Sequence, residues 1–311
     1  ATSKIKQSHH PDINTSKNDI SPFLHWDNQT LYYASDGFVG MGGLDIFLSR
    51  LDATGNWGKV KNIGYPINSP SDENSLIVAK DGRTAYFASA YFNEGRSDLD
   101  LYTFDLPQES RAIEVAYVQG VITDAKTKKT IKAEIELVDL RSGRVFKSSD
   151  SDEDGNYMFC LPSSTDYALT VRKKNYLFYS ENIQIQNKGS ILLKDFKLHA
   201  IQIGEHVRLD NIFFELEAFK LIDASKVELN QILLFMESNP LMVVEIGGHT
   251  DASGSKKFNF DLSLQRAKSV KTALVQRGIK EQRILVKGYG MSKPLNSNTT
   301  DSDRALNRRT E

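Results

Sequence analysis

Residues 242–251 read MVVEIGGHTD, and residues 258–278 read FNFDLSLQRAKSVKTALVQRG. The largely apolar run 242–246 predicts a buried strand. The second stretch carries small or apolar side chains at helical spacing and a glycine after its last turn. This pattern predicts a helix over about 257–277, whose buried side and end are marked by Ser263, Ala267, Val270, Leu274 and Gly278. A strand followed by a helix indicates an α/β unit.

The sequence on either side extends this unit. Residues 207–214 and 284–286 predict two further strands, and 307–311 (NRRTE) would begin a fourth. Between the first two strands, Asp223 is a candidate N-cap for a helix through Met236, and Asn239-Pro240 would stop it. We therefore expect an α/β domain with a mixed sheet and two main helices over residues 206–311.

Short motifs in fixed order accompany these elements. They are NIFF at 211–214, GHTD at 248–251, Asn259, LS at 262–263, RA at 266–267, GYG at 288–290, Pro294, Asn298 and NRR at 307–309. These motifs, in this order, closely resemble those of the OmpA C-terminal-like family. The resemblance implies non-covalent binding of peptidoglycan through the free end of the meso-diaminopimelate residue in its stem peptides.

That ligand carries an ammonium and a carboxylate on one carbon, so its capture needs a carboxylate beside a guanidinium. The resemblance implies that Asp251 takes the ammonium and that Arg266 takes the carboxylate, as a two-pronged fork that lysine could not reproduce. An internal Asp251–Arg266 salt bridge without a ligand is the alternative.

Further site residues follow from the same resemblance. Asn259 and Thr250 would add neutral hydrogen bonds, and Arg308 would reach a carboxylate. Glu217 stands where relatives often have Asp or Asn, which leaves its role less defined.

We expect neither catalysis nor a cofactor or metal in this region. His249, Asp251 and Ser253 are spaced two apart on one segment, so they do not converge easily as a triad. The glycines before Thr250 lack the lysine of a phosphate-binding loop, and the histidines lack zinc spacing.

Residues 1–110 contain an internal repeat. TLYYAS at 30–35 returns as TAYFAS at 84–89, and DIF at 45–47 returns as DLY at 100–102. Upstream, Ile13-Asn14 matches Ile67-Asn68, each followed by an acid and a serine. A repeat of short strands and turns with a period of about fifty residues is typical of propeller blades.

These repeats resemble the WD40-like PD40 blades of bacterial periplasmic proteins. Two blades cannot close a ring, so we expect residues 1–110 to be the C-terminal part of a propeller from a longer chain. Blades shared between chains are the alternative.

Residues 113–202 change to period-two alternation, clearest in AEIELV at 133–138. Six or seven short strands predict a small β-sandwich. The segments VQGVITD at 118–124 and DGNY at 154–157 resemble the carboxypeptidase regulatory-like family, a non-catalytic Ig-like spacer. The acidic run 150–155 opens like a calcium loop, but Leu161 stands where a bidentate Glu is needed, so a solvated hairpin turn is preferred.

The bulk composition limits the partners. Net charge is −1 with a pI of about 6.7, which gives no global basic field for nucleic acid. No run of eighteen apolar residues occurs, and the start, ATSK, has no signal core or lipid-accepting Cys. Membrane association would therefore need a lipid anchor outside this sequence.

Together these features predict a periplasmic, outer-membrane-associated scaffold of a Gram-negative bacterium, bound to the wall by 206–311 and to other envelope or secretion proteins by its propeller. The domain order resembles that of the PorE-type lipoprotein of the Bacteroidota type IX secretion system. A general outer-membrane stabilising or glycan-binding protein, or a stator-like part of an envelope motor, is the alternative.

Overall fold

The computed structural model describes residues 12–52, 55–89, 100–163, 165–185, 191–215 and 218–311. The chain divides into two compact units. The first comprises Ala1–Val118, Phe159–Ser164 and Ile185–Leu192, and the second comprises Gln119–Met158, Thr165–Gln184 and Leu193–Glu311. The division of the sequence into three domains stays a prediction.

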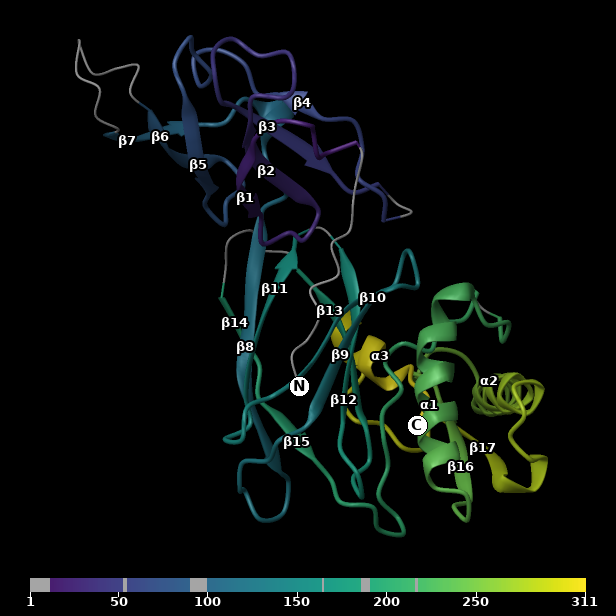
Figure 1. Cartoon of the computed structure of the whole chain (residues 1–311). Coiled ribbons are helices and arrows are strands. Elements are labelled where there is room, and N and C mark those ends of the chain that lie inside the picture. Colours follow the sequence, from purple (N-terminus) through teal and green to yellow (C-terminus); the bar gives the residue numbers. More distant parts are fainter. Residues whose placement is uncertain (1–11, 53–54, 90–99, 164, 186–190, 216–217) are drawn as a thin grey trace. The chain divides into compact units, whose positions relative to one another are not determined.

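The first unit contains two antiparallel sheets (Figure 1). Strand order is β1-β2-β3-β4 in the first sheet and β5-β6-β7 in the second. The strands are β1 (Asp19–Leu24), β2 (Thr30–Ser35), β3 (Asp45–Arg50), β4 (Lys61–Asn62), β5 (Glu73–Val78), β6 (Thr84–Ser89) and β7 (Asp100–Asp105). The two sheets correspond to the two copies of the sequence repeat.

The turn before the second strand is the same in both copies. Asp27 Oδ1 accepts from the backbone N–H groups of Gln29 and Thr30, and Asp27 Oδ2 accepts from the Thr30 hydroxyl. Asp81 makes the same three bonds to Arg83 and Thr84. Each carboxylate accepts from the backbone N–H groups of its own turn, which explains why an aspartate precedes both β2 and β6.

The acid at the start of each first strand also repeats its contacts. Asp19 accepts from the Thr15 backbone N–H and the Ser35 hydroxyl. Glu73 accepts from the equivalent Ser69 and Ser89. The serines two residues further on, Ser21 and Ser75, both have positive φ, and both strands are irregular there. The sequence repeat is thus confirmed down to single hydrogen bonds.

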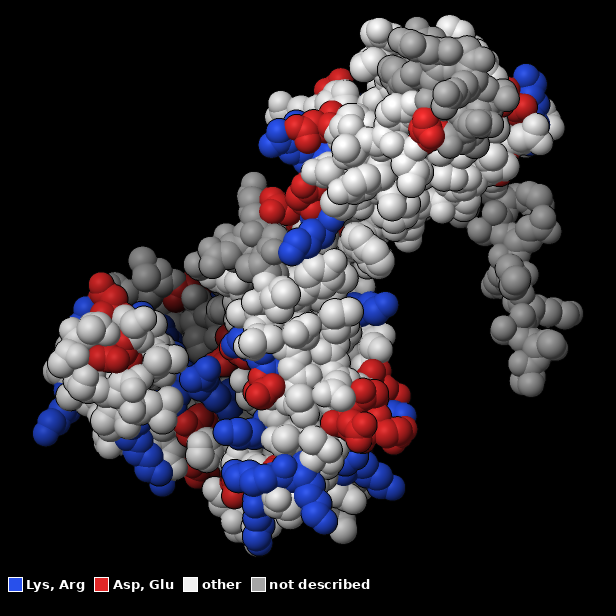
Figure 2. Space-filling model, turned by 90° about the vertical axis from the view of Figure 1, so that its left-hand side faces the viewer, with Lys and Arg blue, Asp and Glu red and all other residues white. Residues whose placement is uncertain are grey.

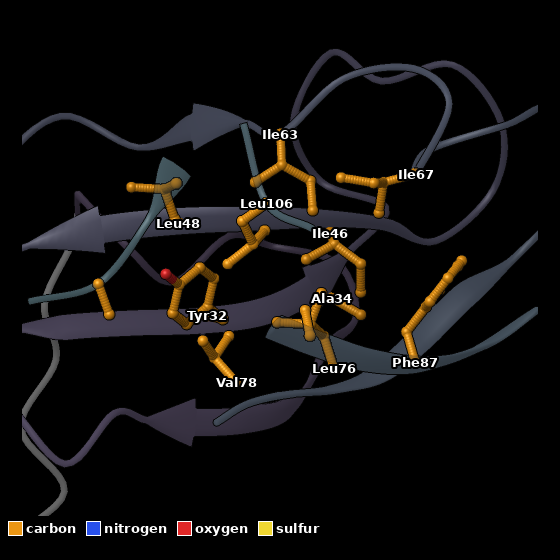
Figure 3. Close-up of a cluster of buried hydrophobic side chains, with 12 residues drawn as sticks. Tyr32, Ala34, Ile46, Leu48, Ile63, Ile67, Leu76, Val78, Phe87 and Leu106 are labelled. Carbon is orange, nitrogen blue, oxygen red and sulfur yellow. The ribbon is translucent and has the colours of Figure 1, made fainter. Parts of the chain in front are cut away.

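The core of the first unit lies between the two sheets, as Figure 3 shows. Side chains of β2 and β3 meet those of β5 and β6, and almost all are under 4% exposed. The largest members are Tyr32, Ile46, Leu48, Leu76, Val78, Phe87 and Leu106. Tyr32 is completely buried, and its hydroxyl donates to the Ser110 carbonyl over 2.6 Å, which satisfies its polar end.

Eight further strands form two more sheets, with strand orders β10-β9-β12-β13 and β11-β8-β14, and β15 pairs with β8. They are β8 (Val115–Asp124), β9 (Glu134–Asp139), β10 (Val145–Asp150), β11 (Asn156–Pro162), β12 (Asp166–Arg172), β13 (Tyr179–Gln184), β14 (Ile191–Leu193) and β15 (Phe196–Leu198). The alternation predicted over 133–138 is confirmed, because Ile135 and Leu137 are fully buried within β9. The Ig-like assignment stays a prediction.

The acidic run 150–155 joins β10 to β11, and these strands lie in different sheets. The predicted hairpin is therefore wrong, although the turn itself is present. Asp152 is engaged within it, since its carboxylate accepts from the Asn156 backbone and side chain. The described residues contain no group of three or more His, Cys, Asp or Glu that could hold a metal.

The C-terminal part of the second unit contains a parallel strand pair with helices. Its elements are α1 (Lys226–Ser238), β16 (Val244–His249), α2 (Lys256–Gln276), β17 (Ile284–Gly290) and α3 (Asp301–Asn307). α2 begins and ends within one residue of its predicted bounds, and Gly278 follows it with φ +103°. Thr310 bridges antiparallel to Gly248, so the sheet is mixed as expected.

Two predictions for this part are wrong. Residues 207–214 form no regular strand, because their pairing is limited to one backbone bond from Leu209 to Thr310 and an isolated bridge between Phe214 and Leu221. Asp223 does not cap α1. It opens a short 3-10 turn (Asp223–Ser225) and forms an ion pair of 2.9 Å with Lys226.

A buried polar cluster connects α1 to β13 within this unit. Glu228 of α1 is fully buried, and its Oε2 accepts from the Ser180 hydroxyl and the Asn211 amide. Its Oε1 has no hydrogen-bond partner among the residues that the structure describes. Burial raises the pKa of Glu228 to about 7, although the bonds from Ser180 and Asn211 lower it.

Side chains of both charge signs are interspersed on the face shown in Figure 2, with Lys and Arg gathered towards its lower end. This agrees with the near-zero net charge of the chain. Among the described residues, the longest apolar helical stretch falls short of what crossing a bilayer requires.

Candidate functional site

Glycines set the distance between helix α2 and the strands beneath it. A Cβ on Gly248 would lie 2.1 Å from the Ser263 carbonyl oxygen, and one on Gly288 would lie 2.8 Å from the Leu264 nitrogen. These are backbone atoms that cannot move aside. The Ser263 hydroxyl also accepts from the Gly290 N–H over 2.9 Å. The motif glycines therefore allow the helix to rest directly on the sheet.

The loop that leaves β16 is held by buried neutral side chains. The Thr250 hydroxyl donates to the Asp251 carbonyl over 2.9 Å. Asn259 of α2, 2% exposed, donates its amide to the carbonyls of Ser253 (2.7 Å) and Asp251 (3.3 Å). In this structure both predicted site residues use their donors to shape the loop that carries Asp251.

Asp251 presents its carboxylate at the end of β16. Its Oδ1 accepts from the Ser253 backbone N–H over 2.9 Å, and its Oδ2 accepts from Arg308 Nη1 over 2.6 Å. Burial on its own raises the pKa of Asp251, but the bonds from Arg308 and Ser253 outweigh it and the net shift is downward. The group is therefore ionised at neutral pH and retains acceptor capacity for a further donor.

Arg266 lies on α2 and is not paired directly with Asp251. Its Nε donates to the Ala218 carbonyl over 3.0 Å, and its guanidinium lies 4.9 Å from the centre of the Phe214 ring. Within the described part of the chain, its two Nη groups have no hydrogen-bond partner. Burial and the charge of Arg308 lower the pKa of Arg266, while Asp251 raises it. Arg266 is thus anchored by its Nε edge, and none of the described residues accepts a hydrogen bond from its Nη atoms.

Arg308 is held in place by the residue before it. Asn307 is fully buried, and its side-chain oxygen accepts from the Leu295 and Asn296 backbone N–H groups. After Arg308 the chain runs beside β16, where the Arg309 carbonyl accepts from His249. The NRR motif therefore places Arg308 near the end of β16, next to Asp251.

The alternative of an internal Asp251–Arg266 salt bridge is not what this geometry shows, because the salt bridge of Asp251 is made with Arg308. The ligand contacts expected of Asp251 and Arg266 stay predictions. Glu217 lies outside the described residues. Phe214 and the Ala218 carbonyl, which hold Arg266, could not be recognised from the sequence because neither carries a charge.

One carboxylate and two guanidinium groups therefore lie in mutual electrostatic range at this end of the sheet. Such a set can bind a zwitterion, with an ammonium on Asp251 and a carboxylate on a guanidinium fork. His249 is set apart from this chemistry. It is buried, stacks on Tyr289 with ring centres 4.9 Å apart, and lies 3.4 Å from the Glu311 carboxylate.

Comparison with known proteins places this site within a recognised domain. Residues 213–308 match the OmpA family, so the chain carries an OmpA-like C-terminal domain. Outer membrane porin F of Pseudomonas fluorescens is 36% identical over 110 residues, which are 35% of this chain and 34% of that protein. The probable lipoprotein YiaD of Escherichia coli (strain K12) is 34% identical over 111 residues, 35% of this chain and 51% of that protein.

The peptidoglycan-binding protein ArfA of Mycobacterium tuberculosis is 40% identical over 100 residues, 32% of this chain and 31% of that protein. Among solved structures, the peptidoglycan-associated lipoprotein of Burkholderia pseudomallei is 26% identical with a TM-score of 0.31, covering 32% of this chain and 85% of that chain. The chain spans about a third to a half of the length of these curated relatives.

Proposed function

We propose that the OmpA-like domain binds peptidoglycan non-covalently through the zwitterionic end of its diaminopimelate residues. The observation that carries this proposal is the Asp251–Arg308 pair at the end of β16, whose charges act on Arg266 of α2. The similarity to ArfA, which is named as a peptidoglycan-binding protein, supports it. The protein would then act in the bacterial envelope.

In this proposal the ligand ammonium donates to the Asp251 carboxylate, and the ligand carboxylate accepts from the Nη groups of Arg266. Arg308 either shares Asp251 with the ammonium or turns towards the ligand carboxylate. Asn259 and Thr250 act as positioning residues, because their donors hold the loop. Charge-assisted hydrogen bonds contribute about 1.5–3 kcal/mol each.

The test is sedimentation of the purified chain with sacculi that contain diaminopimelate. We expect Asp251→Ala and Arg266→Ala each to weaken binding roughly ten- to a hundredfold, in line with the loss of one charge-assisted bond. Asp261→Ala and Arg277→Ala are matched controls, because they remove the same charges from α2 and its C-cap, outside the loop that carries Asp251. Unchanged binding by the double variant Asp251→Ala/Arg266→Ala would contradict the site.

A second comparison tests the ligand. Lysine-type peptidoglycan lacks the second carboxylate, so it should bind much more weakly than the diaminopimelate type. Equal binding of both types would show that Arg266 does not hold a ligand carboxylate.

The remaining domains would give the wall-bound protein a scaffold role. We propose that the repeat sheets are propeller blades that bind envelope proteins and that the following sheets are a spacer. The domain order supports a place in type IX secretion machinery anchored at the outer membrane. Co-purification from cells that lack residues 206–311 tests this, since secretion components should still be recovered. Their loss would assign partner binding to the wall-binding domain.

A further inference from the structure

Strands β8, β12 and β15 all finish at the same end of their two sheets. Register places Arg172 of β12 opposite Glu134, where β9 begins, and Leu198 of β15 beside Asp124, where β8 ends. The Tyr176 hydroxyl donates to the Asp124 carboxylate over 2.8 Å, so the segment after β12 is held against the end of β8. The segments that follow these strands therefore lie together at this end of the second unit.

This end of the second unit carries exposed lysines from three segments. They are Lys126, Lys128 and Lys129 after β8, Lys174 after β12, and Lys197 within β15. We call these residues the lysine tip. Figure 2 shows Lys and Arg gathered towards its lower end, in agreement with this placement. Positive charge from separate parts of the sequence is thus brought to one place.

The carboxylates close to the lysine tip have other partners. Asp124 is buried, and its carboxylate accepts from backbone N–H groups of its own turn and from a tyrosine hydroxyl. The acidic turn 150–155 lies to one side, where Glu153 pairs with Lys132 over 2.8 Å. Among the residues that the structure describes, no carboxylate lies within ion-pair distance of a lysine of the tip. The charges of the tip are therefore not neutralised by ion pairs there.

The lysine tip has the character of a surface for many anionic groups and not of a pocket for one ligand. Residues 126–130 are all exposed, and this loop adds only Thr127 and Thr130 to its lysines. A lysine ammonium is a hydrated point charge on a flexible stem, without the planar fork with which arginine recognises a single carboxylate or phosphate. The loop therefore supplies charge without a fixed shape, and it has no apolar side chain to insert into a partner.

We propose that the lysine tip binds an anionic lipid bilayer through the phosphate groups on its surface. A bilayer presents these groups over a flat area, so an exposed tip meets several of them at once, and each lysine near such a surface adds to the attraction. The contact is local, which is compatible with a net charge of −1 for the whole chain. It would hold the second unit at a bilayer without a lipid anchor. The tip lies outside the Asp251 site, so this proposal stands or falls separately from the proposed function.

The test is sedimentation of the whole chain with lipid vesicles at low salt. We expect binding to phosphatidylcholine vesicles that contain phosphatidylglycerol, and no binding to vesicles of phosphatidylcholine alone. Raising the salt from about 0.1 M to about 1 M shortens the screening length from about 10 Å to about 3 Å, so the chain should be released. Inorganic phosphate added at constant ionic strength should not release it, because one phosphate cannot contact all three segments of the tip.

The variant Lys126→Gln/Lys129→Gln/Lys174→Gln removes three charges of the tip from exposed positions. Each lysine near an anionic surface contributes about fivefold in affinity, so this variant should bind the anionic vesicles roughly a hundredfold more weakly. Replacing the same three lysines by arginine keeps the charge and should keep the binding.

The matched control is Lys256→Gln/Lys257→Gln/Lys268→Gln, which removes the same charge from exposed positions of α2 and should bind like the native chain. Equal weakening of the tip variant and this control would show a general charge effect and overturn the proposal. So would equal binding to neutral and anionic vesicles, or full binding by the glutamine variant of the tip. Release by inorganic phosphate would assign the tip to a discrete phosphate ligand instead, and tighter binding to soluble polyglutamate than to vesicles would assign it to an acidic protein segment.

Discussion

Arg308 Nη1 lies 2.6 Å from Asp251 Oδ2, so two residues expected to contact a ligand separately are hydrogen-bonded to each other. The carboxylate end is nearly buried, with 10% of the Asp251 side chain exposed, whereas 48% of the Arg308 side chain is exposed. Burial thus fixes the position of the Asp251 carboxylate, whereas the exposed Arg308 side chain is free to move. Under the proposed function, ligand binding would be an exchange of partners around a stationary carboxylate.

The first prediction concerns the pH dependence of that carboxylate. Arg308→Ala should raise the pKa of Asp251, because it removes a principal cause that lowers it. A depressed pKa makes the ionised form available until the pH falls through the folded value, so the variant should lose ligand binding at a higher pH than the native protein. Carboxyl NMR titration with and without muropeptide measures both. Arg308→Lys, which keeps the charge, should shift the pKa less; an unchanged titration in Arg308→Ala would refute the pairing in solution.

The second prediction concerns Glu228, whose pKa is raised from 4.5 to about 7. Because its pKa is higher in the folded state, the contribution of Glu228 to the free energy of unfolding is fully present below pH 4.5 and is lost as the pH rises through 7. The loss amounts to about 3 kcal/mol, at 1.36 kcal/mol per pKa unit. Glu228→Gln cannot ionise and should remove this part of the pH dependence. Urea unfolding of both proteins at pH 5 and pH 8 measures this dependence. If the free energy of unfolding changed equally between the two pH values in the native protein and in Glu228→Gln, the prediction would be contradicted.

The third prediction compares two equivalent aspartates of the repeat. Asp27 is fully buried, whereas Asp81 makes the same turn bonds at the surface. Burial raises the pKa of Asp27, but His25 and the backbone N–H groups of Gln29 and Ile113 lower it, to about 2. Ionised Asp27 therefore contributes about 2 kcal/mol to the free energy of unfolding above pH 3.8, and this contribution is lost as the pH falls towards 2. Asp27→Asn should therefore destabilise the first unit clearly more than Asp81→Asn in thermal unfolding, and equal costs would argue against the burial difference.

The fourth prediction tests the close approach of α2 to the sheet. Gly248→Ala places a Cβ 2.1 Å from the Ser263 carbonyl, so the helix must move and stability should fall by about 1–3 kcal/mol. Gly247→Ala is the neighbouring control, since its Cβ meets side-chain atoms rather than backbone, the Tyr289 ring at 3.1 Å and His249 Nε2 at 3.5 Å. Binding to sacculi should weaken in Gly248→Ala even where the protein is folded. If the folded Gly248→Ala protein bound sacculi as strongly as the native protein, binding would not depend on the close packing of α2 against the sheet.

The sequence predicted those elements whose signals are local. The helix α2 carries its periodicity and its terminal glycine within about twenty residues, and the two copies of the repeat keep their turn aspartates in register. Asp251 and Arg266 are recognisable through motif text in one continuous stretch. These features depend on neighbours along the chain, so one sequence suffices to predict them.

The features that the sequence did not predict depend on residues far apart in the chain. Asp251 and Arg308 are separated by 57 positions, and nothing local in the sequence indicates that they are hydrogen-bonded to each other. Residues 207–214 have the apolar character of a strand but lack a long neighbour with which to pair. Asp223 has the type of an N-cap residue, yet the 3-10 turn moves the helix start to Lys226.

The single bond between Leu209 and Thr310 has a mechanical consequence. From the beginning of the OmpA-like domain, the shortest route to Arg308 crosses that one backbone hydrogen bond and two peptide units. The route to Arg266 runs through the apolar contacts of α2, which involve many side chains. Under the proposed function, tension on a wall fragment held by Arg308 would pass through residues 309–311 into β16, to which Gly247 and His249 bind them by backbone hydrogen bonds. Tension on a fragment held by Arg266 would pass through the apolar side chains around α2 instead, so the two arginines would transmit load through different elements.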